Sequence, residues 1–130
     1  MKYLHTMIRV GNLEKSIQFY CEILNFKLES RQDYPTGKFT LAFLRSANDE
    51  QNGPMLELTY NWGVSQYDIG KGYGHVAYKV SSLEEIQKKL LEAGLNFSWG
   101  PGKTPNGQTN MAFVMDPDGY KIELLEYLQT

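Results

Sequence analysis

Residues 4–10 read LHTMIRV, and residues 74–80 read GHVAYKV. The two stretches align when the sequence is shifted by 70 residues, from 4 to 74. Near the end of each copy the shift is 66 residues, which aligns LEL at 56–58 with IEL at 122–124. Matches that recur in the same order indicate an internal duplication. The chain therefore contains two copies of one structural unit.

Each copy is expected to begin with a strand, continue with a helix and end with further strands. Residues 3–10 alternate in the way that is typical of a half-buried strand. Asn12 and Ser82 are expected to cap the two helices. The apolar stripe of the first helix is expected to contain Leu13, Ile17, Tyr20, Cys21 and Leu24. Further strands are expected at 39–45, 55–61, 111–115 and 120–127. The chain is thus expected to be an α+β protein with approximate two-fold symmetry.

The length of 130 residues predicts one domain. We expect it to consist of modules at about 1–66 and 71–130, joined by a linker at about 67–74. The net charge of -2 argues against nucleic acid as a partner, because such surfaces are normally basic. No apolar run approaches the length of a membrane span, and the N-terminus has no signal-peptide pattern. With a single cysteine, Cys21, these features predict a cytoplasmic protein that does not bind membranes.

The duplication aligns the only two histidines, His5 and His75, and also the glutamates Glu57 and Glu123. Each glutamate stands between aliphatic residues, so its carboxylate points to the opposite face of its strand. A carboxylate on an enclosed face is costly unless it is paired or bound to a cation. Two imidazoles and two carboxylates, completed by two waters, suit an octahedral divalent ion. A histidine or glutamate taken singly is more often an ordinary surface residue, but matched pairs favour a metal site.

Arg9 and Asn61 follow His5 and Glu57 by four residues each, on the same strand faces. An arginine and an asparagine at one end of a metal cleft can bind a substrate carboxylate. An outward-facing Arg9 at a strand end is an equally good interpretation.

The whole chain resembles glyoxalase I (lactoylglutathione lyase), of the short bacterial class within the vicinal oxygen chelate superfamily. The resemblance is carried by the paired repeat and by two specific runs, ELTYNWG at 57–63 and DPDGYKIE at 116–123. It implies two βαβββ modules that form mixed, barrel-like sheets, the glyoxalase/bleomycin-resistance fold. It also places the metal ligands on His5, Glu57, His75 and Glu123.

The resemblance further implies one divalent ion per site, with Ni²⁺ or Co²⁺ favoured and Zn²⁺ as the alternative. Such enzymes are homodimers whose sites usually form between subunits, with the first half of one chain facing the second half of its partner. The sequence leaves open whether the site of this chain lies within one chain or between subunits. Arg9 and Asn61 match residues that hold the γ-glutamyl end of glutathione. Lys71 matches a position for the glycyl carboxylate, and Lys103 lies in a loop, 100–107, like the mobile loop over the thiol conjugate. Lys121 stands where longer relatives have a tryptophan.

The implied reaction is methylglyoxal detoxification. It isomerises the hemithioacetal of methylglyoxal and glutathione, or another small thiol, to S-D-lactoylglutathione through an enediolate. By resemblance Glu123 is the catalytic base, and Glu57 faces the other side of the enediolate. Three alternatives share the scaffold: a metal-dependent thiol transferase, a dioxygenase, and a drug-binding module without catalysis. A dioxygenase would need only one carboxylate beside two histidines, and a sequestering module would need no metal ligands.

Overall fold

The computed structural model describes residues 1–127. The chain divides into two compact units, one from Met1 to Asp68 and one that begins at Ile69. The division falls within the segment expected as a linker. The grouping of both modules into one domain stays a prediction.

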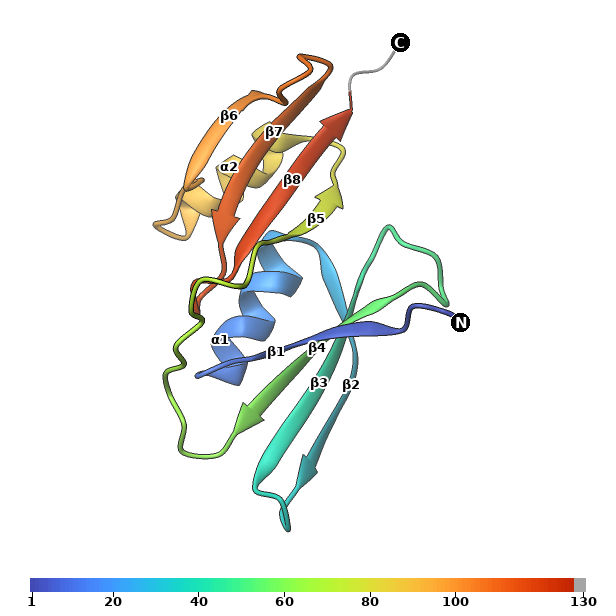
Figure 1. The fold of residues 1–130 in the computed structure, drawn as a ribbon, viewed down its shortest axis with the longest axis vertical. Helices are drawn as coiled ribbons and strands as arrows, with labels where there is room; N and C mark the ends of the chain where they lie inside the picture. The colour runs from blue at the N-terminus through green and yellow to red at the C-terminus, as the bar shows by residue number, and fades with distance from the viewer. Residues whose placement is uncertain (128–130) are drawn as a thin grey trace. The chain divides into compact units, whose positions relative to one another are not determined.

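The first unit contains one short helical segment and one four-stranded sheet (Figure 1). Its strands lie in the order β1-β4-β3-β2, with β1 parallel to β4 and the other neighbours antiparallel. The helix α1 packs against β4, and a π-helical turn, η1, packs against β2. The elements are β1 His5–Arg9, α1 Leu13–Gln18, η1 Phe19–Ile23, β2 Phe26–Tyr34, β3 Phe39–Ser46 and β4 Met55–Asn61.

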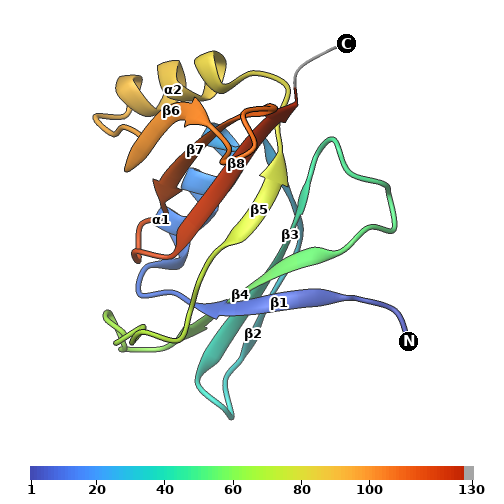
Figure 2. The same ribbon diagram turned by 45° about the horizontal axis from the view of Figure 1, so that its top comes forward.

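The second unit repeats this topology. Its strands lie in the order β5-β8-β7-β6, and β5 is parallel to β8. Figure 2 shows β1 beside β4 and, in the other unit, β5 beside β8. The elements are β5 Val76–Lys79, α2 Leu83–Glu92, β6 Trp99–Lys103, β7 Thr109–Met115 and β8 Lys121–Tyr127. The expected α+β class and the paired βαβββ modules are confirmed.

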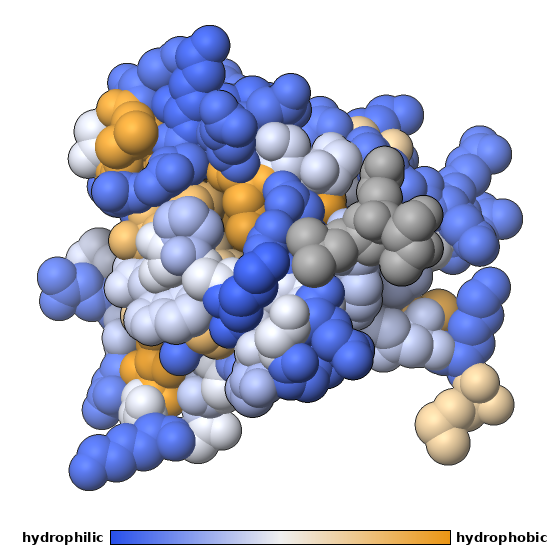
Figure 3. Space-filling model, turned by 90° about the horizontal axis from the view of Figure 1, so that it is seen from above, coloured by the Kyte–Doolittle hydropathy of each residue, from blue (hydrophilic) through white to orange (hydrophobic). Residues whose placement is uncertain are grey.

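The core follows from the alternation of side chains along the strands. In β1, Ile8 is buried, and so is Val10 just beyond the strand, whereas Arg9 between them is exposed. The same alternation buries Leu58 in β4 and Leu124 in β8. Hydrophobic atoms form small separate areas on the mostly hydrophilic face that Figure 3 shows, which is ordinary for a protein surface. One face of each sheet is therefore packed and the other remains available for a site.

Both helix caps form as expected. The Asn12 side chain accepts a hydrogen bond from the Lys15 backbone N–H at 3.1 Å, and Ser82 Oγ accepts one from the Glu85 N–H at 3.1 Å. Gly94, with φ of +75°, follows the end of α2, because glycine readily adopts the left-handed conformation that commonly terminates a helix. The local sequence thus fixes where each helix begins.

The expected stripe of the first helix is partly wrong. Its buried residues include Ser16, Phe19 and Ile23, whereas Cys21 is only half-buried. The helix changes to the π-helical turn η1 at Phe19, and a π turn holds more residues than an α turn. The residues that face the sheet are therefore displaced from the regular helical spacing.

Neither helix in residues 1–127 is both long enough and apolar enough to cross a membrane.

Candidate metal and substrate site

His5 and Glu57 form the first half of the candidate site. The distance from His5 Nε2 to Glu57 Oε1 is 3.0 Å, and the two side chains are 37% and 13% exposed. His5 begins β1, and Glu57 lies opposite Met7 in the adjoining strand β4. Because the flanking Leu56 and Leu58 are buried, the carboxylate points to the face that the core leaves open.

His75 and Glu123 form the second half in the same way. The distance from His75 Nε2 to Glu123 Oε1 is 3.7 Å, and the side chains are 40% and 18% exposed. His75 directly precedes β5, and Glu123 lies opposite Ala77 in the parallel pair of β5 and β8. The structure therefore brings each predicted histidine to its own predicted glutamate.

An aromatic ring supports each histidine, which the sequence reasoning missed. Phe43 lies edge-on to His5, and Phe113 lies edge-on to His75, with ring centroids 5.5 Å apart in both cases. Phe43 also lies opposite Glu57, and Phe113 lies opposite Glu123. The repeat could have revealed these two rings, because the 70-residue shift aligns Phe43 with Phe113.

The donor set fits a first-row divalent ion, since imidazole nitrogens and carboxylate oxygens are ligands that such ions accept. Each pair is partly open to solvent, so an ion and a substrate could reach it. Within residues 1–127, no three His, Cys, Asp or Glu side chains gather closely enough to hold a metal. The structure thus supplies two pairs of ligands, one in each unit, and their union into one four-ligand site stays a prediction.

Arg9 and Asn61 lie toward one end of the face that carries His5 and Glu57. Arg9 is opposite Thr59 in the register of β1 and β4, and Asn61 is the last residue of β4. The Asn61 Nδ2 group donates a hydrogen bond to Tyr67 Oη at 2.9 Å. This placement agrees with a carboxylate clamp, which stays a prediction.

The two predicted lysines lie in different settings within the second unit. Lys71 is exposed in the segment before β5. Lys103 was expected in a loop over 100–107, but it is the last residue of strand β6 and pairs with Asn110 of β7. The loop was implied by the family resemblance, whereas pairing with β7 makes residues 99–103 a strand with a register shift between Trp99 and Gly102. The turn of the hairpin therefore begins after Lys103.

Lys103 borders a cavity of about 350 Å³ on the second unit. Its walls are Trp99, Lys103, Pro105, Met111, Phe113 and Lys121. Lys121 Nζ lies 4.1 Å from the centre of the Phe113 ring, a distance typical of a cation–π contact. The cavity thus joins apolar walls to two positive charges, beside the ring that supports His75.

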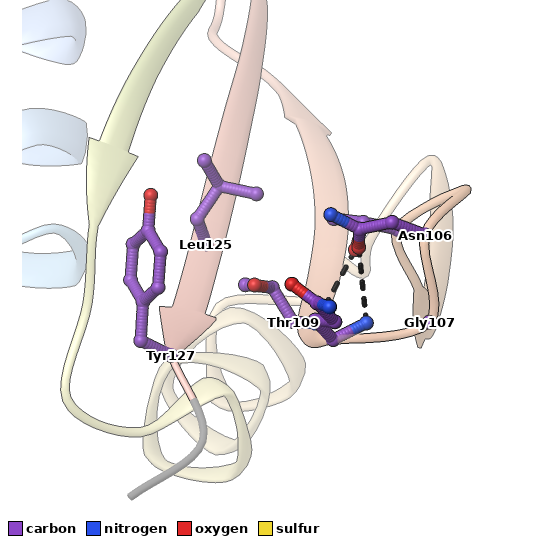
Figure 4. A pocket seen from close by; sticks show the side chains of 7 residues that line it. Asn106, Gly107, Thr109, Leu125 and Tyr127 are labelled. Carbon is purple, nitrogen blue, oxygen red and sulfur yellow. Dashed lines mark hydrogen bonds between the residues drawn. The ribbon is translucent and has the colours of Figure 1, made fainter.

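A second cavity, of about 720 Å³, lies between the β6–β7 turn and β8. Figure 4 shows Leu125 and Tyr127 on one side and the turn residue Asn106 on the other. Asn106 Oδ1 accepts hydrogen bonds from Thr104 Oγ1 at 2.7 Å and from the Gln108 N–H at 3.0 Å. These bonds hold the turn beside the end of the strand that carries Glu123.

Tyr73 lies two residues before His75 in the sequence, and the pKa of its hydroxyl group is shifted. Desolvation by burial, and secondly the charge of Asp116, raise the pKa of its hydroxyl above the ordinary value. Its ring packs edge-on against Tyr120 with centroids 5.4 Å apart. Tyr73 therefore stays neutral at ordinary pH.

Residues 2–124 match the model of the Glyoxalase/Bleomycin resistance protein/Dioxygenase superfamily. A probable lactoylglutathione lyase of Synechocystis sp. is 48% identical over 126 residues, covering 97% of this chain and 95% of the relative. A lactoylglutathione lyase of Neisseria meningitidis is also 48% identical, covering 97% and 91%. Among solved structures, the trypanothione-dependent glyoxalase I of Leishmania major superposes with a TM-score of 0.83 and 42% identity, covering 97% of this chain and 86% of that one. The chain, with a histidine–glutamate pair in each of its two repeated units, belongs to the Glyoxalase/Bleomycin resistance protein/Dioxygenase superfamily and, within it, to the lactoylglutathione lyases.

Proposed function

We propose that the chain isomerises the hemithioacetal of methylglyoxal and a small thiol to the lactoyl thioester, with His5, Glu57, His75 and Glu123 as the ligands of one divalent ion. The observation that carries this proposal is the repeated pair of imidazole and carboxylate on the open face of each sheet. The relatives named lactoylglutathione lyase support the reaction type.

The ion that we propose is Ni²⁺ or Co²⁺, with Zn²⁺ as the alternative. When bound, a divalent ion supplies Lewis-acid stabilisation of negative charge on substrate oxygen, typically worth several kcal/mol. Since Irving–Williams affinities and metal supply both decide which ion is loaded, the ligand set alone favours no single one of them.

Glu123 is the proposed catalytic base. Its carboxylate takes the proton from the carbon that bears the hydroxyl group, and the C–H electron pair moves into the enediolate. The same carboxyl group then returns a proton to the neighbouring carbon, and the proton of the original hydroxyl group passes to the neighbouring oxygen, which gives S-D-lactoylglutathione when the thiol is glutathione. No electrons leave the substrate, so no redox cofactor is needed. A positioned base of this kind contributes about 10²–10⁴-fold in rate.

The remaining predicted residues bind the thiol part of the substrate. Arg9 and Asn61 are proposed to hold the γ-glutamyl end, because they lie together at the end of the first unit's open face. Lys71 and Lys103 are proposed to attract the glycyl carboxylate. The Leishmania major relative is described as trypanothione-dependent, so the thiol is the part of the substrate that we leave open between glutathione and another small thiol.

We further propose that residues 1–130 act as one vicinal oxygen chelate domain in a cytoplasmic homodimer. The site is formed either within one chain or between subunits, and in both cases it draws one ligand pair from each unit.

The test is a thioester assay on protein freed of metal with a chelator and reloaded separately with Ni²⁺, Co²⁺ or Zn²⁺. We expect thioester formation from the hemithioacetal only after reloading. Parallel assays of catechol cleavage and of thiol transfer to an antibiotic distinguish the alternative enzymes. Metal-loaded protein that forms no thioester with any small thiol would contradict the proposal, and protein that binds none of the three ions would favour a sequestering module.

A further inference from the structure

We propose that Thr59 is a positioning residue that fixes Glu57, so that the two carboxylates of the duplicated site are mechanically unequal. This inference rests on the proposed function, because it concerns which carboxylate can move during proton transfer. It was not suggested by the repeat, which makes Glu57 and Glu123 equivalent.

Both oxygens of Glu57 are engaged. Its Oε1 atom lies 3.0 Å from His5 Nε2, and its Oε2 atom accepts a hydrogen bond from Thr59 Oγ1 at 3.3 Å. Thr59 stands two residues further along β4 and therefore on the same strand face. It is only 8% exposed, so its hydroxyl has little competition from water. Packing and hydrogen bonding together hold the Glu57 carboxylate in one orientation.

Glu123 lacks this support. The 66-residue shift that aligns Glu57 with Glu123 aligns Thr59 with Leu125, whose side chain has no hydroxyl and borders the cavity of Figure 4. Among residues 1–127, the polar contact found for Glu123 is the one to His75, at 3.7 Å. The second carboxylate therefore has rotational freedom that the first does not have.

This difference assigns the roles of the two groups by physical means. A carboxylate that serves as base has to turn toward the substrate carbon and back, whereas a permanent ligand gains from being held still. Glu57, which Thr59 holds in place, is suited to remain a metal ligand throughout the reaction. Glu123, which has Leu125 in place of a hydroxyl donor, is suited to be the base that moves.

The first arm of the test measures Co²⁺ binding to the metal-free protein by competition with a chelator, which needs no substrate. Thr59→Val removes the hydroxyl and keeps the branched shape, and Thr59→Ser keeps the hydroxyl. Hydrogen-bond partners of metal ligands typically contribute 10–100-fold to metal affinity. We expect Thr59→Val to raise the Co²⁺ dissociation constant about tenfold, and Thr59→Ser to stay within about twofold of the parent.

The second arm introduces a hydroxyl group at the equivalent position of the second unit. Leu125→Thr places a donor two residues from Glu123, and Leu125→Val is its matched control of similar shape. We expect Leu125→Thr to bind Co²⁺ at least as tightly as Leu125→Val, and to have a kcat about tenfold lower at similar KM, because the base is restrained.

Equal Co²⁺ affinity of Thr59→Val and the parent would overturn the inference, as would equal losses in Thr59→Val and Thr59→Ser. Equal kcat values for the two Leu125 variants would also overturn it. These outcomes are separate from a failure of the proposed function, which would appear as a Co²⁺-loaded parent protein that forms no thioester. If Thr59→Val does not fold, as judged by circular dichroism, the Leu125 pair still decides the question.

Discussion

The rings of His75 and Phe113 meet edge to face, with their centroids 5.5 Å apart. The same Phe113 ring carries Lys121 Nζ over its face at 4.1 Å and packs against Trp99. A ring held on several sides restricts the imidazole that it touches. Phe113 thus links the wall of the smaller cavity to the orientation of a proposed metal ligand.

Phe113→Ala should weaken Co²⁺ binding about tenfold, because His75 loses the ring that orients it. The same change should lower the free energy of unfolding by about 2 kcal/mol, less than for a fully buried phenylalanine. Chelator competition and urea unfolding measure the two effects. Phe113→Leu is the control that keeps most of the volume, and a Co²⁺ affinity unchanged in Phe113→Ala would contradict the prediction.

Glu123→Gln should abolish thioester formation, since the amide can neither accept the substrate proton nor ligate the ion as a carboxylate does. We expect a loss in kcat of at least about 10²-fold. Glu84→Gln, an exposed change in the first turn of α2, controls for the altered charge. Near-normal turnover by Glu123→Gln would rule out its role as base.

Arg9→Ala should act mainly on binding, because the guanidinium is proposed to hold the substrate far from the reacting carbon. We expect KM to rise about tenfold or more, as for the loss of a charge-assisted hydrogen bond, with a smaller change in kcat. Arg31→Ala is a matched control, because Arg31 lies on the edge strand β2 and pairs with Glu14. An unchanged KM would exclude the clamp.

Glu126 should make stability depend on pH. Its carboxylate accepts a hydrogen bond from Asn110 Nδ2 at 3.0 Å and one from the Leu83 N–H at the start of α2 at 2.7 Å. These bonds, the one from Asn110 first, hold the pKa of Glu126 below its ordinary value. A carboxyl group with a lowered pKa stabilises the fold above its unfolded pKa of about 4.3 and loses that contribution as the pH falls through its folded value.

The measurement is thermal unfolding of the parent and of Glu126→Gln between pH 7 and pH 3. The parent should be the more stable by about 1 kcal/mol at pH 7, and the difference should vanish toward the acid end. A difference that is constant over the whole range would assign the effect to packing and not to charge.

The sequence predicted those features that the duplication repeats or that local chemistry determines. The histidine–glutamate pairs followed from the repeat, and the helix caps at Asn12 and Ser82 followed from side chains that bond to nearby backbone. Strand β2 was not predicted, because all its residues after Phe26 are exposed and an edge strand of this kind shows no alternation. Strand β6 was not predicted, because Gly100 has a φ of +88° at a register shift in the pairing with β7, and Gly102 has no side chain that could show alternation.

The contact between Thr59 and Glu57 was also beyond the sequence. Their spacing in the sequence places Thr59 and Glu57 on one face of the strand. The choice of hydrogen-bond partner among several polar neighbours, however, depends on side-chain rotamers. The same applies to Lys121, whose ammonium group lies over the Phe113 ring.

In each unit the histidine stands at the start of the fold and the glutamate on its closing strand, and those strands are neighbours. A ribosome must therefore finish synthesising a unit before that unit can present a complete ligand pair. Shortening the chain before β8 would remove one carboxylate and strip the adjacent imidazole of its neighbour in a single event. A half-finished copy would therefore contribute only one of its two proposed metal ligands.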